Sequence, residues 1–219
     1  MPAAVCFDLD GTLFDDRQYV RAGLERAGEV YAERTGVDLT DAFLRAYFQA
    51  NATDATFDAV LAERGYSLDA VPELVDAYHA NDAALVPFSD VEPTLSVLKN
   101  EYALGLVTGG RNGRAKLHRL GLADYFDIVI VTSELDTSKR EPKPYKTALR
   151  ELDVPAEAAV YVGDRPSLDV LQPRALGMRT VRVRRGQYAE RVPTGDAVPD
   201  VTIDSLAELP DLLASLPDD

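Results

Sequence analysis

The chain has 219 residues, which is enough for one large domain or for a core domain with a smaller insert. It carries 37 acidic and 23 basic residues, and a net charge of −14 disfavours nucleic acid and anionic membranes as partners. No apolar run approaches the ~20 residues that a membrane span needs, and the single cysteine, Cys6, excludes an internal disulfide. We therefore expect a cytoplasmic protein that binds neither nucleic acid nor membranes.

The basic residues comprise 18 arginines and only 5 lysines. Two interpretations of the acidity are open. The protein is either an ordinary soluble acidic protein or one adapted to high salt, where dense carboxylates hydrate the surface and screening weakens their repulsion. The excess of Asp, the scarcity of Lys and a core without Trp favour a halophilic protein.

The first predicted strand, residues 4–7, is followed by a long stretch with helical periodicity and no good strand, residues 15–85. We expect four helices there. Because they follow the first strand directly, they are expected above its carboxyl end, on the ligand side of an α/β sheet. The expected division is a core of residues 1–14 and 87–219 and a helical insert of residues 15–86.

Five more apolar runs predict the remaining strands, and most of them are rich in Val and Ile, as in parallel sheets covered on both faces. They are residues 103–107, 128–131, 159–162, 180–183 and 201–203. Helical patterns accompany them over residues 89–100, 114–120, 145–152, 167–176 and 206–216, and residues 186–199 are expected to form a surface loop. This alternation predicts an α/β fold built on a doubly wound parallel sheet.

Two acidic residues, Asp8 and Asp10, follow the first strand, and Gly11 then allows a sharp turn. Alternate residues of a strand point the same way, so both carboxylates lie on one side. A divalent cation would offset their repulsion, and Mg²⁺ prefers hard oxygen ligands and few carboxylates. The pattern indicates a metal site, while a polar strand end that happens to hold two acids remains the alternative.

Thr108 and Gly109 follow the second apolar run, where a hydroxyl and a bare backbone N–H could bind a phosphoryl oxygen, although an ordinary loop would look the same. A basic turn with Lys139 and Lys143 follows the third run. Three of the five lysines fall within residues 139–146, and a lysine there would act as a point charge against a phosphoryl group. A basic surface turn fixed by prolines is the alternative.

Asp164 follows the fourth apolar run, and Asp169 lies five residues further on. Asp164 would complete a metal site with Asp8. Asp169 could hold a metal-bound water or the lysine, or it could serve only as a first-turn acid of a helix. Because parallel strands leave the sheet at one edge, all four segments should converge on a single cleft.

The order and spacing of these segments resemble the four signature motifs of the haloacid dehalogenase superfamily, over almost the whole chain. The matching residues are Asp8-Leu9-Asp10-Gly11-Thr12-Leu13, Thr108, Lys139, and Gly163-Asp164 with Asp169. The resemblance implies a Rossmann-like core, a C1-type helical cap, Mg²⁺ and an aspartyl-phosphate intermediate. It implies a phosphatase that acts on a small phosphorylated metabolite such as phosphoglycolate, a sugar phosphate or a nucleotide.

The resemblance also implies a role for each residue. Asp8 is the nucleophile and Asp10 the general acid and base, while Thr108, the Gly109 N–H and Lys139 balance charge on the phosphoryl oxygens. The metal ligands are Asp8, the backbone carbonyl of Asp10, and Asp164, with Asp169 in support. The third motif usually reads Lys-Pro-Asp-Pro, so Lys143-Pro144 is a rival match, but the distance to the following helix favours Lys139. Gly109 stands where Asn is frequent.

Three other functions share these features: a sugar phosphomutase, a haloacid dehalogenase, or a non-catalytic phospho-acceptor or interaction module. Dehalogenation needs neither a metal nor an acid for the leaving group, so Asp10 and Asp164 favour phosphoryl chemistry. A phosphomutase also uses the second Asp and stays open. Phospho-acceptor domains are shorter and lack a helical insert. The physiological substrate, the cap residues that set specificity and the oligomeric state are left open by the sequence.

Overall fold

The computed structural model describes residues 2–50, 52–53 and 55–216, and the chain divides into two compact units. The larger unit comprises Met1–Asp15 and Leu85–Asp219, and the smaller unit, Asp16–Ala84, is inserted after the first strand. Each unit has its own core and is described by itself. The catalytic and cap roles that the sequence assigns to these two parts of the chain remain predictions.

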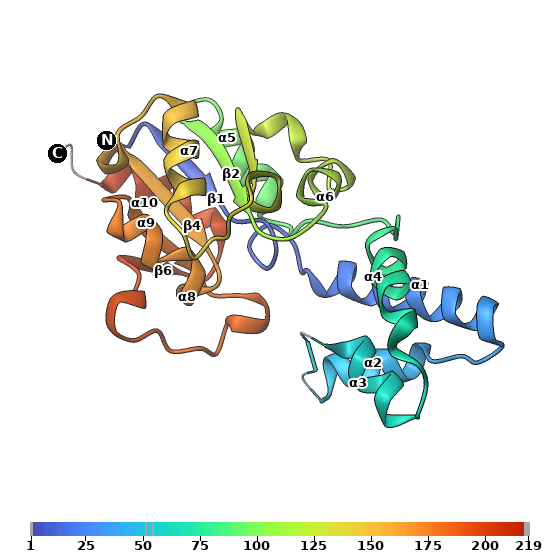
Figure 1. The fold of residues 1–219 in the computed structure, drawn as a ribbon. Helices are drawn as coiled ribbons and strands as arrows, with labels where there is room; N and C mark the ends of the chain where they lie inside the picture. The colour runs from blue at the N-terminus through green and yellow to red at the C-terminus, as the bar shows by residue number, and fades with distance from the viewer. Residues whose placement is uncertain (1, 51, 54, 217–219) are drawn as a thin grey trace. The chain divides into compact units, whose positions relative to one another are not determined.

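Six strands of the larger unit form a fully parallel sheet in the order β3-β2-β1-β4-β5-β6 (Figure 1). They are β1 (Ala4–Phe7), β2 (Ala103–Thr108), β3 (Ile128–Val131), β4 (Ala159–Gly163), β5 (Arg179–Val183) and β6 (Val201–Ile203). Every residue of β1 and β4 is buried, as expected for strands covered on both faces. The predicted α/β class with a doubly wound parallel sheet is confirmed, and each strand ends within one residue of its apolar run.

The helices of this unit surround the sheet (Figure 1). They are α5 (Val91–Leu98), α6 (Gly113–Arg119), α7 (Lys143–Leu152), α8 (Pro166–Asp169), α9 (Leu171–Ala175) and α10 (Leu209–Ser215). The prediction of one helix over residues 167–176 is wrong, because the segment breaks at Val170 into two short helices. Pro173 has no N–H to donate to the carbonyl of Asp169, so a continuous helix would lack that bond. The predicted loop 186–199 contains two short 3₁₀ helices.

Alternation along β1 divides the core between the two faces of the sheet. Ala4 and Cys6 pack with Tyr145 and Ala148 of α7, while Val5 and Phe7 point to the opposite face. The chain runs from β1 through β2 and β3 and then returns to the other side of β1 with β4. In sheets of this kind, ligands bind outside the carboxyl ends of the strands at this point of reversal.

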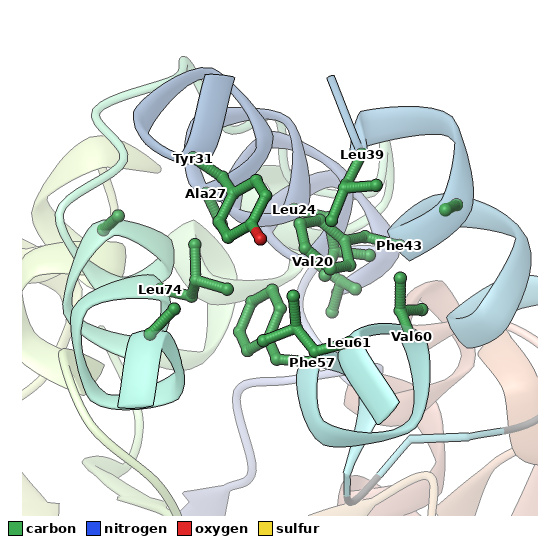
Figure 2. Packing of buried hydrophobic residues seen from close by; sticks show 13 residues of the cluster. Val20, Leu24, Ala27, Tyr31, Leu39, Phe43, Phe57, Val60, Leu61 and Leu74 are labelled. Carbon is green, nitrogen blue, oxygen red and sulfur yellow. The ribbon is translucent and has the colours of Figure 1, made fainter. Parts of the chain in front are cut away.

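The smaller unit is an all-helical bundle whose described α-helices are α1 (Arg17–Thr35), α2 (Thr40–Phe48), α3 (Thr56–Glu63) and α4 (Val71–His79), with a short 3₁₀ helix, Leu68–Ala70, before α4. Buried residues recur every three or four positions along α1, and they line a core that Figure 2 shows from close by. The rings of Phe43 and Phe57 meet edge to face there, with their centroids 5.0 Å apart. Gly28 lets α2 approach α1, since a Cβ at that position would lie 2.0 Å from Oγ1 of Thr40.

Among the described residues, no helix combines the length and the apolar character that a membrane crossing requires.

Candidate active site

Sheet register brings the first and fourth sequence motifs together. Phe7, the last residue of β1, lies beside Val162 of β4, and the backbone N–H of Asp8 donates to the Val162 carbonyl at 2.9 Å. Asp8 therefore leaves the sheet next to Asp164, which directly follows β4. One carboxylate oxygen from each of Asp8, Asp164 and Asp169 lies within 4.8 Å of the others, and all three residues are buried.

The two oxygens of Asp164 differ in their surroundings. Oδ1 accepts a hydrogen bond from the Thr12 hydroxyl at 3.1 Å, whereas Oδ2 is buried with no partner in the part of the chain that the structure describes. Gly11, at φ +82°, closes over it, and a Cβ there would lie 2.5 Å from this Oδ2. A buried carboxylate oxygen without a partner costs free energy, and a cation would offset that cost.

Burial raises the pKa of Asp8 to about 7, with Lys139 opposing the rise and Asp169 adding to it. Burial also raises the pKa of Asp164 to about 8, with further contributions from Asp169 and Asp8. Crowded carboxylates in a site with little water disfavour the charged form unless a counter-charge is present. Hard oxygen donors, few carboxylates and one unpartnered oxygen fit a site for Mg²⁺.

Lys139 is the positive charge of this cluster. Its Nζ lies 2.9 Å from Oδ1 of Asp8 and hydrogen-bonds Oδ1 of Asp169, whose Oδ2 accepts from the Arg165 N–H at 2.9 Å. Burial alone would lower the pKa of Lys139, but Asp169 and Asp8 outweigh it and hold that pKa well above its usual value. The rival residue Lys143 is exposed and donates to the Leu135 carbonyl at 2.6 Å. Of the two lysines, the structure places Lys139 beside Asp8.

The second motif lies close to this lysine. Thr108, the last residue of β2, is fully buried, and its hydroxyl lies 3.3 Å from the Gly109 carbonyl oxygen. A Cβ on Gly109 would lie 3.9 Å from Cδ of Lys139. Gly113, at the start of α6, packs so tightly that a Cβ there would lie 2.6 Å from Cγ2 of Thr108. Phosphate binding by Thr108 and the Gly109 N–H remains a prediction.

Asp10 has a partner that the sequence analysis missed. The Nζ of Lys116, on α6, lies 2.7 and 2.9 Å from the two carboxylate oxygens of Asp10. Lys116 is 7 % exposed. The helical spacing of Gly113, Lys116 and Leu117 places all three on the buried side of α6, and a lysine in such an apolar stripe is the signal that could have revealed it.

Comparisons with known proteins agree with this geometry. The family model described as "Haloacid dehalogenase-like hydrolase" matches residues 5–183. A glyceraldehyde 3-phosphate phosphatase from Methanopyrus kandleri is 36% identical, with each chain covered in full. A crystal structure of a 2-haloacid dehalogenase from Pseudomonas syringae pv. Tomato has a TM-score of 0.72 at 30% identity, covering 98% of this chain and 99% of that one. That of a HAD phosphatase from Thermococcus onnurineus has a TM-score of 0.68 at 29% identity, covering 96% and 97%.

The family model spans most of the chain, and the relative from Methanopyrus kandleri matches it from end to end. The four segments that carry the resemblance all leave the parallel sheet, or follow it, within this matched region. The chain is therefore an enzyme of the haloacid dehalogenase-like hydrolase family.

Proposed function

We propose that the protein is a Mg²⁺-dependent phosphatase that hydrolyses a small phosphate monoester through an aspartyl-phosphate formed on Asp8. One observation carries this proposal: Asp8 is packed between the buried ammonium of Lys139, 2.9 Å away, and Asp164, whose buried Oδ2 has no partner among the described residues. The naming of the 36% identical relative as a glyceraldehyde 3-phosphate phosphatase supports a small phosphate ester as the substrate.

The residues that would hold Mg²⁺ are Asp8 and Asp164, through their carboxylates, and Asp10, through its backbone carbonyl. Bound there, the cation would neutralise part of the charge on the phosphoryl group and on the carboxylates. This also accounts for how a chain of net charge −14 could accept an anionic substrate.

In the proposed first step, a carboxylate oxygen of Asp8 attacks phosphorus while the bond from phosphorus to the ester oxygen breaks. Asp10 gives its proton to the departing alkoxide. In the second step, water attacks the phosphorus of the aspartyl-phosphate, Asp10 takes a proton from that water, and the Asp8 carboxylate is restored as inorganic phosphate leaves. Lys139, the Thr108 hydroxyl and the Gly109 N–H would balance charge on the phosphoryl oxygens. Asp169 would hold Lys139 in place.

The 30% identical dehalogenase makes halide displacement a second candidate. Its leaving halide needs no proton and no cation, so neither Asp10 nor the unpartnered oxygen of Asp164 would have a role. A sugar phosphomutase remains compatible with the same residues, and differs in returning the phosphoryl group to a sugar instead of to water.

The test measures release of inorganic phosphate from p-nitrophenyl phosphate and from glyceraldehyde 3-phosphate, with Mg²⁺ and with EDTA, alongside halide release from 2-chloropropionate. We expect Mg²⁺-dependent phosphate release and no halide release. Asp8→Asn should abolish turnover and keep the fold, while Asp153→Asn, an exposed change of equal charge, should leave the rate unchanged. Phosphate release that survives EDTA or Asp8→Asn would contradict the proposal. Halide release would favour the dehalogenase.

A further inference from the structure

The carboxylate of Asp10 is held by a single ammonium group through both of its oxygens. Lys116 Nζ lies 2.7 Å from Oδ1 and 2.9 Å from Oδ2. The side chain of Lys116 is 8% exposed and that of Asp10 is 28% exposed. The ammonium group is therefore buried, while the carboxylate that it contacts remains partly accessible to solvent. An ion pair of this kind has low conformational freedom, because the lysine stem is enclosed by the protein.

The backbone on both sides of the contact is also fixed. Gly11, which follows Asp10, donates its N–H to the Phe14 carbonyl at 3.0 Å, which closes the turn after β1. Gly113 sets α6 directly against Thr108, and Lys116 lies three residues further along the same buried side of that helix. The helix that packs against the predicted phosphate-binding Thr108 therefore also carries the lysine that contacts Asp10.

Fold stability alone gives a weak reason for this arrangement. Burying an ammonium group is costly, and an apolar residue of similar size commonly replaces a buried ion pair without loss of stability. A buried lysine fixed to a half-exposed acid does confer orientation, because the carboxylate loses its freedom to rotate. Orientation is what a general acid and base needs, since proton transfer requires hydrogen-bond distance to the reacting oxygen.

We propose that Lys116 is a positioning residue that holds the carboxylate of Asp10 in place for proton transfer to the leaving group and from water. This rests on the proposed phosphatase function. Lys116 acts through Asp10, so its removal should resemble a milder form of Asp10→Asn. The effect should depend on how much the leaving group needs a proton.

The experiment compares Lys116→Met and Lys116→Arg with the wild type on two probes of similar size, p-nitrophenyl phosphate and phenyl phosphate. Nitrophenolate is a stable leaving group, whereas phenolate is far more basic and depends on protonation. Lys116→Met should lower kcat/KM, which reports the first, leaving-group-dependent step, by roughly 10- to 100-fold on phenyl phosphate and by only a few-fold on p-nitrophenyl phosphate. The larger loss is a part of the contribution typical of general acid–base catalysis. Lys116→Arg should recover most of the rate, because a guanidinium can contact both oxygens of a carboxylate.

A matched control is Arg114→Met, which removes one positive charge from the same helix and whose contacts with described residues, to Glu134 and the Val129 carbonyl, are exposed. It should leave both rates unchanged. In an Asp10→Asn background, Lys116→Met should add less than about a threefold further loss, since residues acting as a unit are not additive. Thermal unfolding of each variant identifies any that fails to fold, and the leaving-group dependence of Lys116→Arg remains measurable if Lys116→Met does not fold.

Three results would overturn the inference. They are equal losses of kcat/KM on the two probes, a loss that is fully additive in free energy with that of Asp10→Asn, and a higher rate in Lys116→Met, which would mean that Lys116 holds Asp10 away from the reaction. A wild-type protein that releases no phosphate would refute the proposed function itself. An active wild type with an unaffected Lys116→Met would refute this inference alone.

Discussion

The ammonium group of Lys139 lies 2.9 Å from Oδ1 of Asp8 and at the same time hydrogen-bonds Asp169. All three side chains are buried, so their charges are screened weakly and interact strongly. One positive charge shared by two carboxylates keeps Asp8 near a fixed position. The arrangement also explains why Lys139 stays charged despite its burial.

Lys139→Met should therefore cost both stability and activity. It leaves Asp8 and Asp169 buried without their counter-charge, and removal of one partner from a buried pair costs about 3–5 kcal/mol. Lys143→Met is the matched control, because Lys143 is exposed and, among the described residues, hydrogen-bonds the Leu135 carbonyl. Chemical denaturation should show a lower free energy of unfolding for Lys139→Met than for Lys143→Met, and phosphate release should be slower in Lys139→Met. Equal effects would refute the assignment of Lys139 as the lysine of the site.

Asp164→Asn should stabilise the metal-free protein while removing its response to Mg²⁺. An amide can still accept the Thr12 hydrogen bond, and the change relieves repulsion with Asp8 and Asp169. We expect a gain of about 1 kcal/mol at pH 8, or roughly 2–4 °C in Tm for a chain of this size. Scanning calorimetry with EDTA and with Mg²⁺ measures both effects. A rise in Tm with Mg²⁺ that equals that of the wild type would mean that Asp164 is no ligand.

The stability of the metal-free protein should fall as pH rises from about 4 to about 8. In the folded protein the pKa values of Asp8 and Asp164 rise to about 7 and about 8, above the ordinary value of 3.8. The folded state therefore binds more protons than the unfolded state in this range, so the free energy of unfolding decreases with pH. The pKa of Lys139 lies well above 10.5, so its stabilising contribution is lost only at higher pH.

Urea unfolding in EDTA at pH 5, 6, 7 and 8 measures this slope, and Asp164→Asn should make it shallower. Mg²⁺ should oppose the loss more strongly as pH rises, because metal binding requires ionised carboxylates. A metal-free stability that increases over this range in the wild type and in Asp164→Asn alike would contradict the predicted proton uptake.

Gly11→Ala should impair Mg²⁺ binding beyond the cost of backbone strain. Gly11 has φ +82°, and its new Cβ would lie 2.5 Å from Oδ2 of Asp164. Gly121→Ala introduces similar strain at φ +71° with open space around the Cβ. Gly121→Ala should lose about 1–2 kcal/mol of stability, the usual penalty for a side chain in the left-handed region, and Gly11→Ala should lose more because its Cβ also displaces Asp164. Only Gly11→Ala should weaken Mg²⁺ binding, by roughly tenfold or more in calorimetric titration, since it displaces a ligand.

The Tm should rise in concentrated KCl if the acidity is an adaptation to salt. At 0.1 M the screening length is about 10 Å, and at 1 M it is about 3 Å, so the self-repulsion of a chain of net charge −14 weakens. Measuring Tm between 0.1 and 3 M KCl tests this, with phosphate release followed in parallel. A Tm that stays constant or falls would leave ordinary acidity as the better interpretation.

The sequence by itself determined the strands, because an apolar run of three to five residues indicates burial on both faces without reference to the rest of the chain. It also placed Asp8 and Asp164 directly after such runs, and parallel strands must leave a sheet at a common edge. These two facts together predict that Asp8 and Asp164 lie close to each other at that edge. The break between α8 and α9 at Val170 could also have been predicted from the sequence, because Pro173 disfavours a continuous helix. The helical periodicity on both sides of Val170 led to the prediction of a single helix instead.

Only the tertiary structure decided which basic side chain faces which acid. Lys139 lies in the turn before α7 and Lys143 is the first residue of that helix; Lys139 is buried against Asp169, whereas Lys143 is exposed to solvent. Lys116 and Asp10 are 106 positions apart, and they meet because α6 packs against the end of β2. Local periodicity records whether a residue is buried. Its partner depends on the packing of elements distant in the chain, and the sequence carries no local signal for that.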